Sequence, residues 1–457
     1  MKDRYLSISK FLIGIYFMLL YLIFIFSRSF LGIYIFGFRI GEYLVAFSVF
    51  CTFFTLIYFK KNILSLSDKK ILKIFWLMIL YFLLSTFFRR ESFLNPELYK
   101  HSSFLWSIFY IFLGIFISKY FQINKNVAYF LNLNLLLAFY LQLIYFYNLT
   151  LQYGGLAAET RETRILSTTG NRVLDFFILY SDKFETYKGT GFLLFFVLIT
   201  FLNNVYSNKS IVGLSFFYLA SGMFIPVFLI RSRTAAVVAI FYVLIQIFKF
   251  KNYFIKDMKK NIMLSFLFII SFYLSTSLLY EKEVTFQNST EVINYLTLER
   301  NAPQGTRKFL EYENGRLYSG DGNLNWRLQI WQDVISDLKI NNKLIFGYGF
   351  SNEIPAMENS LPGYFGRTGL DGLNKGVHNF VINMLARGGV IIILLYFMLL
   401  FYILKSDKFK YTNANLKFFV LPLLFASLFD VSMENVHFPM FLYLYIGIHL
   451  SRNYDYD

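Results

Sequence analysis

Long apolar segments recur along this chain and dominate its pattern. A helix needs about 20 mostly apolar residues to cross roughly 30 Å of hydrocarbon. Twelve segments qualify, although several are short for a span. They are residues 9–27, 40–59, 71–88, 103–118, 127–147, 189–204, 210–230, 234–250, 262–280, 380–404, 416–430 and 436–451. The pattern predicts an all-α polytopic membrane protein with about 12 transmembrane helices.

The connections between these segments are very unequal in length. Two are long, residues 148–188 and residues 281–379, and the others are short. Loops longer than about 12–15 residues are usually functional. We therefore divide the chain into three parts. Residues 1–280 hold nine spans and the loop at 148–188, residues 281–379 form the large loop, and residues 380–457 hold the last three spans.

Composition agrees with a membrane location. The 457 residues are 56% hydrophobic and only 16% charged, whereas a soluble domain has about 45–50% apolar and about 25% charged residues. The single Cys excludes a disulfide-built secreted module. A net charge of +16 would suggest nucleic acid for a soluble chain. In a membrane protein the side on which the charge lies matters more, so we expect membrane lipids and no nucleic acid as partners.

The charge distribution predicts the orientation. If the N-terminus is cytoplasmic and the spans alternate, the cytoplasmic segments hold 21 of the 44 Lys and Arg residues but only six of the 28 acids. Nearly all of the excess positive charge then lies on one face, as the positive-inside rule requires. Both termini are predicted to be cytoplasmic, and both long loops lie on the opposite face.

Arginine and lysine are distributed differently between the two faces. Of the 21 cytoplasmic cations 19 are Lys, whereas 15 of the 17 Arg residues lie outside. The guanidinium fork binds phosphate or carboxylate through two parallel hydrogen bonds. The excess of Arg outside therefore predicts an anionic ligand there. The alternative is that the outer surface simply favours Arg beside acidic loop residues.

The first candidate site is the turn between the seventh and eighth spans. Arg231 and Arg233 lie in this turn, and Thr234, Ala235 and Ala236 begin the next helix. Two guanidiniums beside the backbone N–H groups of a helix N-terminus suit a diphosphate. The structural alternative is that both side chains extend to the lipid headgroups.

The second candidate is an amphipathic helix in the large loop. Trp326, Ile330, Val334 and Leu338 recur every four residues, which predicts a helix over 326–340. We expect Asn325, directly before it, to be its N-cap.

Arg327 lies one turn before Trp331, next to the apolar face of this helix, and is its candidate binding residue. Gly347 and Gly349 follow the end of the helix and permit a tight turn. The alternative interpretation is an ordinary surface helix with a solvated Arg.

The third candidate begins the tenth span. His378 lies at the membrane boundary, where an imidazole can titrate or donate a hydrogen bond. Asn379, Asn383 and Arg387 follow on successive turns and form a polar stripe that enters the membrane. Ionisable residues inside a span are costly, so function is the default hypothesis for them. A structural role is the alternative for the His.

The fourth candidate lies between the last two spans. Asp430 and Glu434 are an i, i+4 pair, with His437 one turn later if the helix persists. We expect Pro439 to begin the final helix. Either carboxylate could act as a base, or it could simply pair with an outer Arg.

No motif for a metal, a nucleotide or a serine nucleophile occurs in the chain. Cys51 lies in the middle of a span, where packing is its simplest role. We therefore expect no metal and no cofactor.

Together these residues resemble the O-antigen ligase/polymerase superfamily of bacterial envelopes. The matching features are RSRT at 231–234, Arg327 followed by Trp331, FGYG at 346–349, and His378 with Asn379. The resemblance covers residues 231–395, and the first half of the chain is similar only in hydropathy. Each motif is short, so the specificity comes from their order, spacing and predicted side of the membrane.

The resemblance implies a fold and an activity. Members of the superfamily are inner-membrane, metal-independent glycosyltransferases with a GT-C-like fold, and they use undecaprenyl-diphosphate-linked glycans at the periplasmic face. Carried over, Arg231, Arg233 and Arg327 would bind the diphosphate, and His378 would lie beside the acceptor. Glu434 matches an acidic position only loosely.

Further expectations concern neighbouring residues and partners. Trp331, Asn379 and Arg387 are expected to contact other parts of the substrate, and Asp430 is a second candidate base. Donor and acceptor would both be undecaprenyl-diphosphate-linked oligosaccharides, with a chain-length regulator protein as a further partner.

Four functions remain open. A polymerase is favoured over a ligase that transfers the glycan to lipid A-core, because the many Ile, Lys, Asn and Phe residues suit a variable serotype-specific gene cluster. A capsule polymerase is a related alternative. A lipid-linked oligosaccharide flippase should have short loops on both faces and charges deep within several spans, unlike this chain.

Overall fold

We describe the fold from a computed structural model of the chain. It describes residues 14, 18–19, 21–26, 29–63, 66–120, 125–144, 172–181, 189–206, 211–249, 258–279, 310–358, 376–407, 415–430, 432–434 and 436–451. The predicted first span at 9–27 and both chain termini lie largely or wholly outside these residues, as do parts of both long loops.

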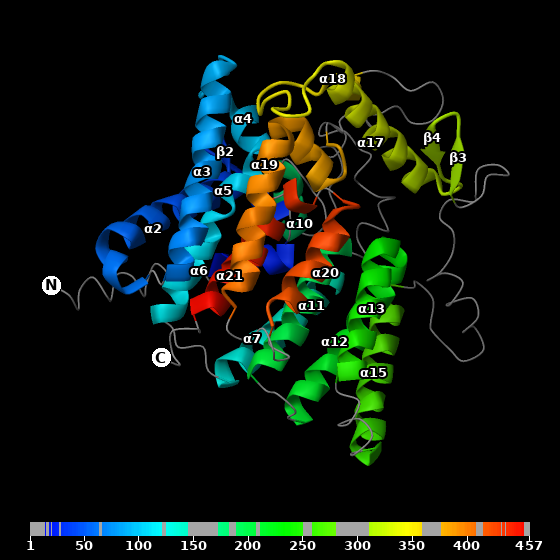
Figure 1. The fold of residues 1–457 in the computed structure, drawn as a ribbon. Coiled ribbons are helices and arrows are strands. Elements are labelled where there is room, and N and C mark those ends of the chain that lie inside the picture. The colour runs from blue at the N-terminus through cyan, green and yellow to red at the C-terminus, as the bar shows by residue number, and fades with distance from the viewer. Residues whose placement is uncertain are drawn as a thin grey trace.

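Helices dominate the described chain, and each predicted segment from the second to the twelfth contains one (Figure 1). Because these segments are apolar, a helix satisfies their backbone groups without solvent. The long helices are α2 (Ile40–Ile63), α3 (Leu66–Phe88), α6 (Phe109–Tyr120), α7 (Lys125–Gln142), α11 (Gly189–Tyr206), α12 (Ile211–Arg231), α13 (Arg233–Lys249), α15 (Met258–Leu279), α19 (Phe380–Lys405), α20 (Lys417–Ser427) and α21 (His437–Ser451).

Short elements connect them. They are the hairpin of β1 (Tyr34–Ile35) and β2 (Phe38–Arg39), the helices α4 (Pro96–His101), α5 (Ser103–Trp106) and α10 (Arg172–Tyr180), and the 3-10 turn η3 (Ser432–Glu434).

Four of the described helices are long and apolar enough to cross a membrane. They contain the candidate spans Lys69–Phe88, Val212–Leu229, Met258–Leu279 and Phe380–Lys405, and further apolar helices are shorter. The chain is therefore a multi-pass membrane protein. The total of 12 spans, the division into three parts and the GT-C-like architecture stay predictions.

The core of the bundle lies around α11 and α21. Every residue of α21 is buried, and α11 contacts α7, α12, α13, α20 and α21. Glycines permit the closest helix pairs, as is common in membranes. A Cβ on Gly114 of α6 would overlap the backbone of Leu444 in α21, and a Cβ on Gly222 of α12 would overlap that of Phe268 in α15.

The described part of the large loop folds over one end of the bundle (Figure 1). It contains an antiparallel hairpin of β3 (Glu311–Glu313) and β4 (Arg316–Tyr318), the helix α17 (Gly322–Ile340) and the single turn α18 (Pro355–Glu358). Ile330, Val334 and Leu338 of α17 are completely buried in a small core that also contains residues 354, 357 and 377. The predicted amphipathic helix is confirmed.

The predicted N-cap of this helix is wrong. The helix begins one turn earlier, where the Asp321 side chain accepts a hydrogen bond from the Leu324 N–H at 2.8 Å. The polar first turn carries no apolar periodicity, so the pattern misses it. Asn325 instead accepts a hydrogen bond from the Ser319 N–H at 3.0 Å and ties the helix to the β3–β4 hairpin.

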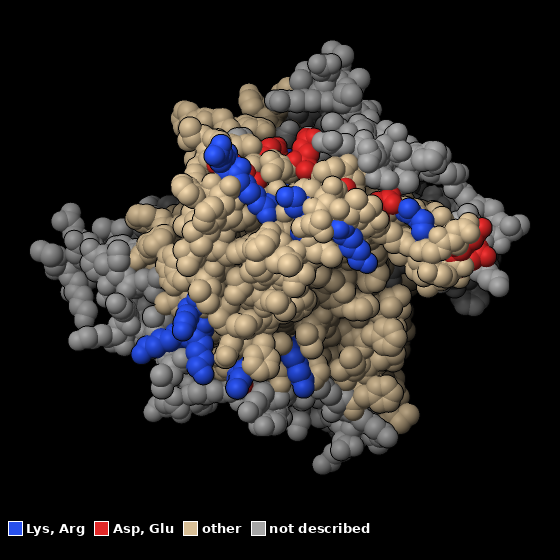
Figure 2. Space-filling model, turned by 45° about the horizontal axis from the view of Figure 1, so that its top comes forward, with Lys and Arg blue, Asp and Glu red and all other residues tan. Residues whose placement is uncertain are grey.

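Charged residues divide between the two ends of the bundle, as Figure 2 shows. The end covered by α17, which we call the loop end, carries both cations and acids. The opposite end, which we call the lysine end, carries the exposed side chains of Lys69, Lys70, Lys259, Lys260, Lys405 and Lys417. This arrangement is consistent with the predicted orientation.

Candidate functional site

Three of the four candidate sites meet at the loop end. Arg327 of α17 donates a hydrogen bond to the Phe429 carbonyl, between α20 and α21. Trp331 donates from Nε1 to the Val377 carbonyl at 2.9 Å, and the Trp326 ring meets the His378 ring edge-on at a centroid distance of 4.9 Å. The sequence therefore identified segments that the fold brings together.

Arg327 lies mostly inside this region. Its Nε is buried and has no hydrogen-bond partner among the described residues. Burial lowers the pKa of Arg327, whereas Asp430 and Asp321 act in the opposite direction. A buried guanidinium with a donor to spare is suited to an anionic ligand.

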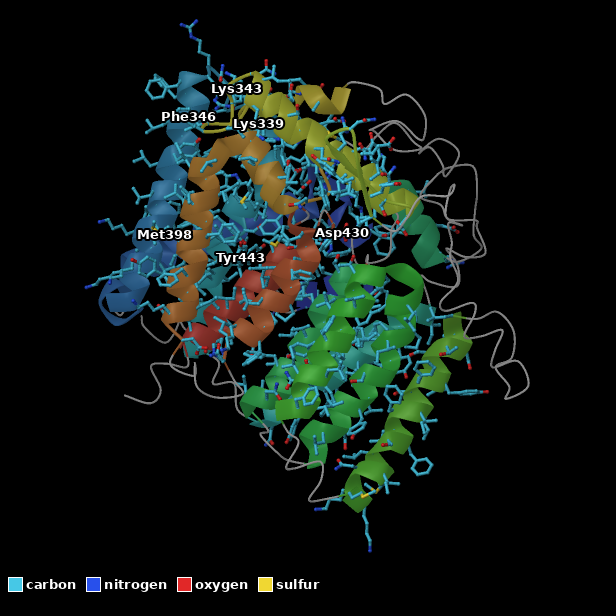
Figure 3. All side chains as sticks on the ribbon, turned by 45° about the vertical axis from the view of Figure 1, so that its right-hand side comes forward. Lys339, Lys343, Phe346, Met398, Asp430 and Tyr443 are labelled. Atoms are coloured by element: carbon cyan, nitrogen blue, oxygen red, sulfur yellow. The ribbon has the colours of Figure 1, made fainter. Side chains whose placement is uncertain are left out.

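Asp430 is held by two hydroxyl groups. Thr190, in the first turn of α11, donates to Oδ2 at 2.6 Å, and Ser432 donates to the same oxygen at 3.1 Å. Asp430 is buried and interacts electrostatically with Arg327. Figure 3 shows it near the middle of the molecule, where the C-terminal helices approach α17. These contacts suit a fixed counter-ion.

The helical relation predicted for the acidic turn is wrong. The chain bends at Asp430, and Glu434 ends the 3-10 turn η3. The final helix begins at His437, so Pro439 is its third residue rather than its first. Asp430, Ser432 and Glu434 bond to groups of other helices instead of continuing α20. One example is Ser103, whose Oγ donates to the Glu434 carbonyl at 3.1 Å.

His378 has an unusual backbone conformation. Its φ is 57°, in the left-handed region that few residues other than Gly adopt. Asn379 directly after it is the N-cap of α19, and its side-chain oxygen accepts from the N–H groups of Val381 and Ile382 at 3.0 and 3.1 Å. The imidazole is thus held at the N-terminus of α19, between the capped first turn of this helix and the Trp326 ring.

The polar stripe of α19 is present and largely buried. Asn383 is 6% exposed and Arg387 only 2%. Arg387 donates a hydrogen bond to the Asn352 carbonyl and interacts electrostatically with Glu434 and Glu91, among other acids. Its guanidinium therefore connects the large loop with the acidic turn.

The predicted glycine turn is confirmed, and it binds to a break in α19. Gly347 and Gly349 have φ values of 66° and 108°. Gly389, with φ 70°, interrupts the helix and frees backbone groups there. The Tyr348 and Gly349 N–H groups donate to the carbonyls of Ala386 and Arg387 at 2.7 and 2.9 Å.

Sequence reasoning missed the segment that holds this turn from the other side. After α3, Arg89 donates from Nη2 to the Phe346 carbonyl at 2.5 Å. The Phe350 N–H donates to Glu91 Oε2 at 3.3 Å, and the His101 Nδ1 lies 3.0 Å from the Phe350 carbonyl. The only available signal was a run of charged residues directly after a predicted span.

His101 is neutral near pH 7. Burial lowers its pKa to about 4, and the positive charge of Arg387 acts in the same direction, against the Phe350 carbonyl and Glu97. The residue is therefore a hydrogen-bonding support of the turn and carries no charge at neutral pH.

The first candidate site can be described only through its backbone. Arg231 ends α12 and Arg233 begins α13, and their side chains lie outside the described residues. Ser232 between them is the cap of α13, because its Oγ accepts from the Ala235 N–H at 3.2 Å. The predicted diphosphate role of these two residues stays a prediction.

Within the part of the chain that the structure describes, no group of three His, Cys, Asp or Glu residues could hold a metal ion. Cys51 is a half-buried residue of α2.

The comparison with known protein families matches this region. A family model described as O-antigen ligase matches residues 217–397, from α12 to the middle of α19. This stretch contains the arginine turn, Arg327, the glycine turn and His378. No curated protein matches the chain. The match confirms the resemblance to the O-antigen ligase/polymerase superfamily.

Proposed function

We propose that this multi-pass membrane protein, whose residues 217–397 belong to the O-antigen ligase/polymerase superfamily, is a surface-polysaccharide polymerase. It joins undecaprenyl-diphosphate-linked repeat units at the periplasmic face of the inner membrane. The main support is that α17 brings Arg327 to the Phe429 carbonyl and to the charge of Asp430, while Trp326 on the same helix contacts His378. Arg327 comes from the folded large loop, and His378 and Asp430 come from the end of the bundle that this loop covers.

The proposed reaction is a single displacement at the anomeric carbon of the donor. A hydroxyl oxygen of the acceptor sugar attacks this carbon and forms the new glycosidic bond. The bond from the carbon to the phosphate oxygen breaks, and undecaprenyl diphosphate leaves with the electron pair. The proton of the acceptor hydroxyl passes to a base of the enzyme.

The leaving diphosphate needs charge stabilisation more than it needs a proton, because it is already a stable anion. Arg327 supplies a buried cation with an unused donor, and Arg231 and Arg233 are proposed to complete the clamp. Such fixed cations are usually the largest contribution to catalysis of this kind. The enzyme would then need no metal ion.

His378 is the preferred base. Asp430 already accepts two hydroxyl hydrogen bonds and faces Arg327, and Glu434 faces Arg387. Both carboxylates therefore already have partners within the protein, and His378 is the base that we propose. The left-handed backbone of His378 is the kind of local strain that concentrates at functional sites.

Trp331, Asn379 and Arg387 are proposed to act mainly by positioning. Trp331 fixes the segment before His378 through the Val377 carbonyl, and Asn379 caps α19. Arg387 is almost completely buried. Direct contact of these three with the glycan is the expectation that the geometry supports least.

An O-antigen ligase is the closest alternative, because it would use the same donor and the same face. Lipopolysaccharide from a deletion strain distinguishes the two. Core with a single repeat unit indicates a lost polymerase, whereas bare core with accumulating lipid-linked polymer indicates a lost ligase. A flippase is disfavoured by the folding of the large loop onto the site.

Complementation of the deletion strain tests the site itself. We expect Arg231→Ala, Arg327→Ala and His378→Ala to abolish long polymer while the protein is expressed at its normal level. Near-normal polymer from all three variants would refute the proposed transferase site.

A further inference from the structure

A group of cations lies at one edge of the loop end, away from His378. Arg89 and Arg90 directly follow α3, Lys339 lies in the last turn of α17, and Lys343 lies just beyond that helix. The hydrogen bond from Arg89 to the Phe346 carbonyl joins the two segments. Figure 3 shows Lys339, Lys343 and Phe346 together at this edge. We call Arg89, Arg90, Lys339 and Lys343 the cationic edge.

Exposed apolar side chains lie directly beside the cationic edge. Phe87 and Phe88 end a candidate span of α3 and are 69% and 76% exposed. Ile345 and Phe346 are more than half exposed. The Val390 N–H in α19 donates a hydrogen bond to the Leu344 carbonyl, which fixes the turn that carries these two residues against α19.

The apolar surface continues from there along both helices, and Met398 marks its course in Figure 3. Its members are the exposed residues Leu77, Leu80, Leu83, Leu84, Val390, Leu394, Phe397, Met398 and Phe401. The cationic edge therefore lies where an apolar, lipid-facing surface meets the headgroup region.

The backbone at Arg90 supports a role for its side chain. The N–H groups of Arg90 and Glu91 donate to the carbonyls of Phe87 and Thr86, both at 3.0 Å. This is a helix C-terminus whose left-handed position is usually occupied by Gly. Arg90 has φ 56° there and an exposed side chain. An Arg at such a position is less favourable than a Gly unless its side chain contributes elsewhere.

Acids near the cationic edge are occupied by other groups. Glu91 accepts from the Phe350 N–H, Glu97 pairs with Lys100 at 3.0 Å, and Asp337 accepts from the Tyr348 hydroxyl at 2.6 Å. None of the ion pairs among the described residues involves Arg90, Lys339 or Lys343. These three positive charges therefore face outward.

We propose that the cationic edge binds the phosphate of an anionic membrane phospholipid, whose acyl chains lie along the outward faces of α3 and α19. Positive side chains attract such headgroups, and exposed aromatic and aliphatic residues complement the chains. The site lies apart from the transferase site and does not depend on the proposed reaction. It would anchor the turn that α19 and Arg89 hold.

Lipid-dependent thermal unfolding tests this proposal. The full-length protein in neutral detergent is titrated with dioleoylphosphatidylglycerol, dioleoylphosphatidylcholine or inorganic phosphate. We expect only phosphatidylglycerol to raise the unfolding temperature. Lys339→Gln and Lys343→Gln should each weaken the apparent affinity about fivefold. Adding Arg90→Gln to both should weaken it about 100-fold, whereas Lys339→Arg should retain it.

Lys100→Gln is the matched control. Lys100 is also an exposed Lys in the last turn of a helix at the loop end, but it pairs with Glu97. We expect this variant to bind phosphatidylglycerol normally. The proposal is overturned if the Lys339 and Lys343 variants bind normally, or if Lys100→Gln loses as much affinity. Equal stabilisation by inorganic phosphate alone would also overturn it, because a soluble anion would then be the ligand.

Discussion

Replacement of Gly389 by Ala tests how the large loop is fixed to the membrane helices. Gly389 has φ 70°, and a Cβ there would overlap the backbone of Ile345 and Phe346. With a ψ of −168° this backbone conformation is essentially restricted to Gly, and it costs another residue about 1–3 kcal/mol. The overlap also forces the glycine turn away from α19. The hydrogen bonds between the turn and the helix are then lost, which lowers the free energy of unfolding further.

The second cost follows from the hydrogen bonds between the turn and the helix. They run from Tyr348 to Ala386, from Gly349 to Arg387 and from Val390 to Leu344, with lengths of 2.7 to 2.9 Å. Each contributes about 1 kcal/mol net. If all three are lost, Gly389→Ala lowers the free energy of unfolding by about 4–6 kcal/mol in total.

Gly315 provides the matched control. It lies in the β3–β4 hairpin with φ 77°, and a Cβ there would have no other atom within 4 Å. Gly315→Ala should therefore cost only the backbone contribution, about 1–2 kcal/mol. Unfolding in mixed micelles, followed by tryptophan fluorescence, measures both variants. If Gly389→Ala costs no more than Gly315→Ala, the glycine turn is not bound to α19 as described.

Two further predictions concern the supports of the site. The pKa of His101, about 4 against an ordinary 6.5, means that the unfolded chain binds a proton between these pH values that the folded chain does not. The free energy of unfolding should therefore fall by about 3 kcal/mol as the pH falls from 6.5 to 4. Unfolding titrations at several pH values should show that His101→Gln removes this part of the pH dependence. If the variant keeps the same dependence of stability on pH, the lowered pKa of His101 is contradicted. Thr190→Val removes the 2.6 Å hydrogen bond to Asp430 and should lower the free energy of unfolding by about 1–3 kcal/mol. Thr200→Val on the same helix, where the hydroxyl donates to the backbone carbonyls of Phe196 and Val197, should cost less, and equal costs would contradict the role of Asp430 as a fixed acceptor.

Much of the fold follows from local patterns. Apolar runs predicted the membrane helices, because contact with hydrocarbon requires apolar side chains all round a span. The four-residue repeat of Ile330, Val334 and Leu338 predicted the buried face of α17, because burial selects apolar residues on that face. The polar spacing from Asn379 to Arg387 likewise predicted one helix face.

Contacts between distant segments could not be predicted in this way. Arg89 and His101 are separated by about 250 residues from the carbonyls that they contact, and no periodicity relates them. Thr190 and Ser432 bind the Asp430 carboxylate where the chain bends beyond α20, and a helical repeat does not reveal such contacts. The sequence therefore predicted segments that the fold brings together, but it did not predict the contacts that hold them.

We propose that Arg327 holds the diphosphate of the donor lipid during glycosyl transfer. Transfer by the purified protein, with an undecaprenyl-diphosphate-linked repeat unit as both donor and acceptor, measures this directly. Arg316 is the matched control, because it also lies in the large loop and is fixed by a 2.7 Å ion pair with Asp333. We predict that Arg316→Ala forms polymer at a near-normal rate and that Arg327→Ala is slower by at least 100-fold. Equal rates for the two variants would contradict the account.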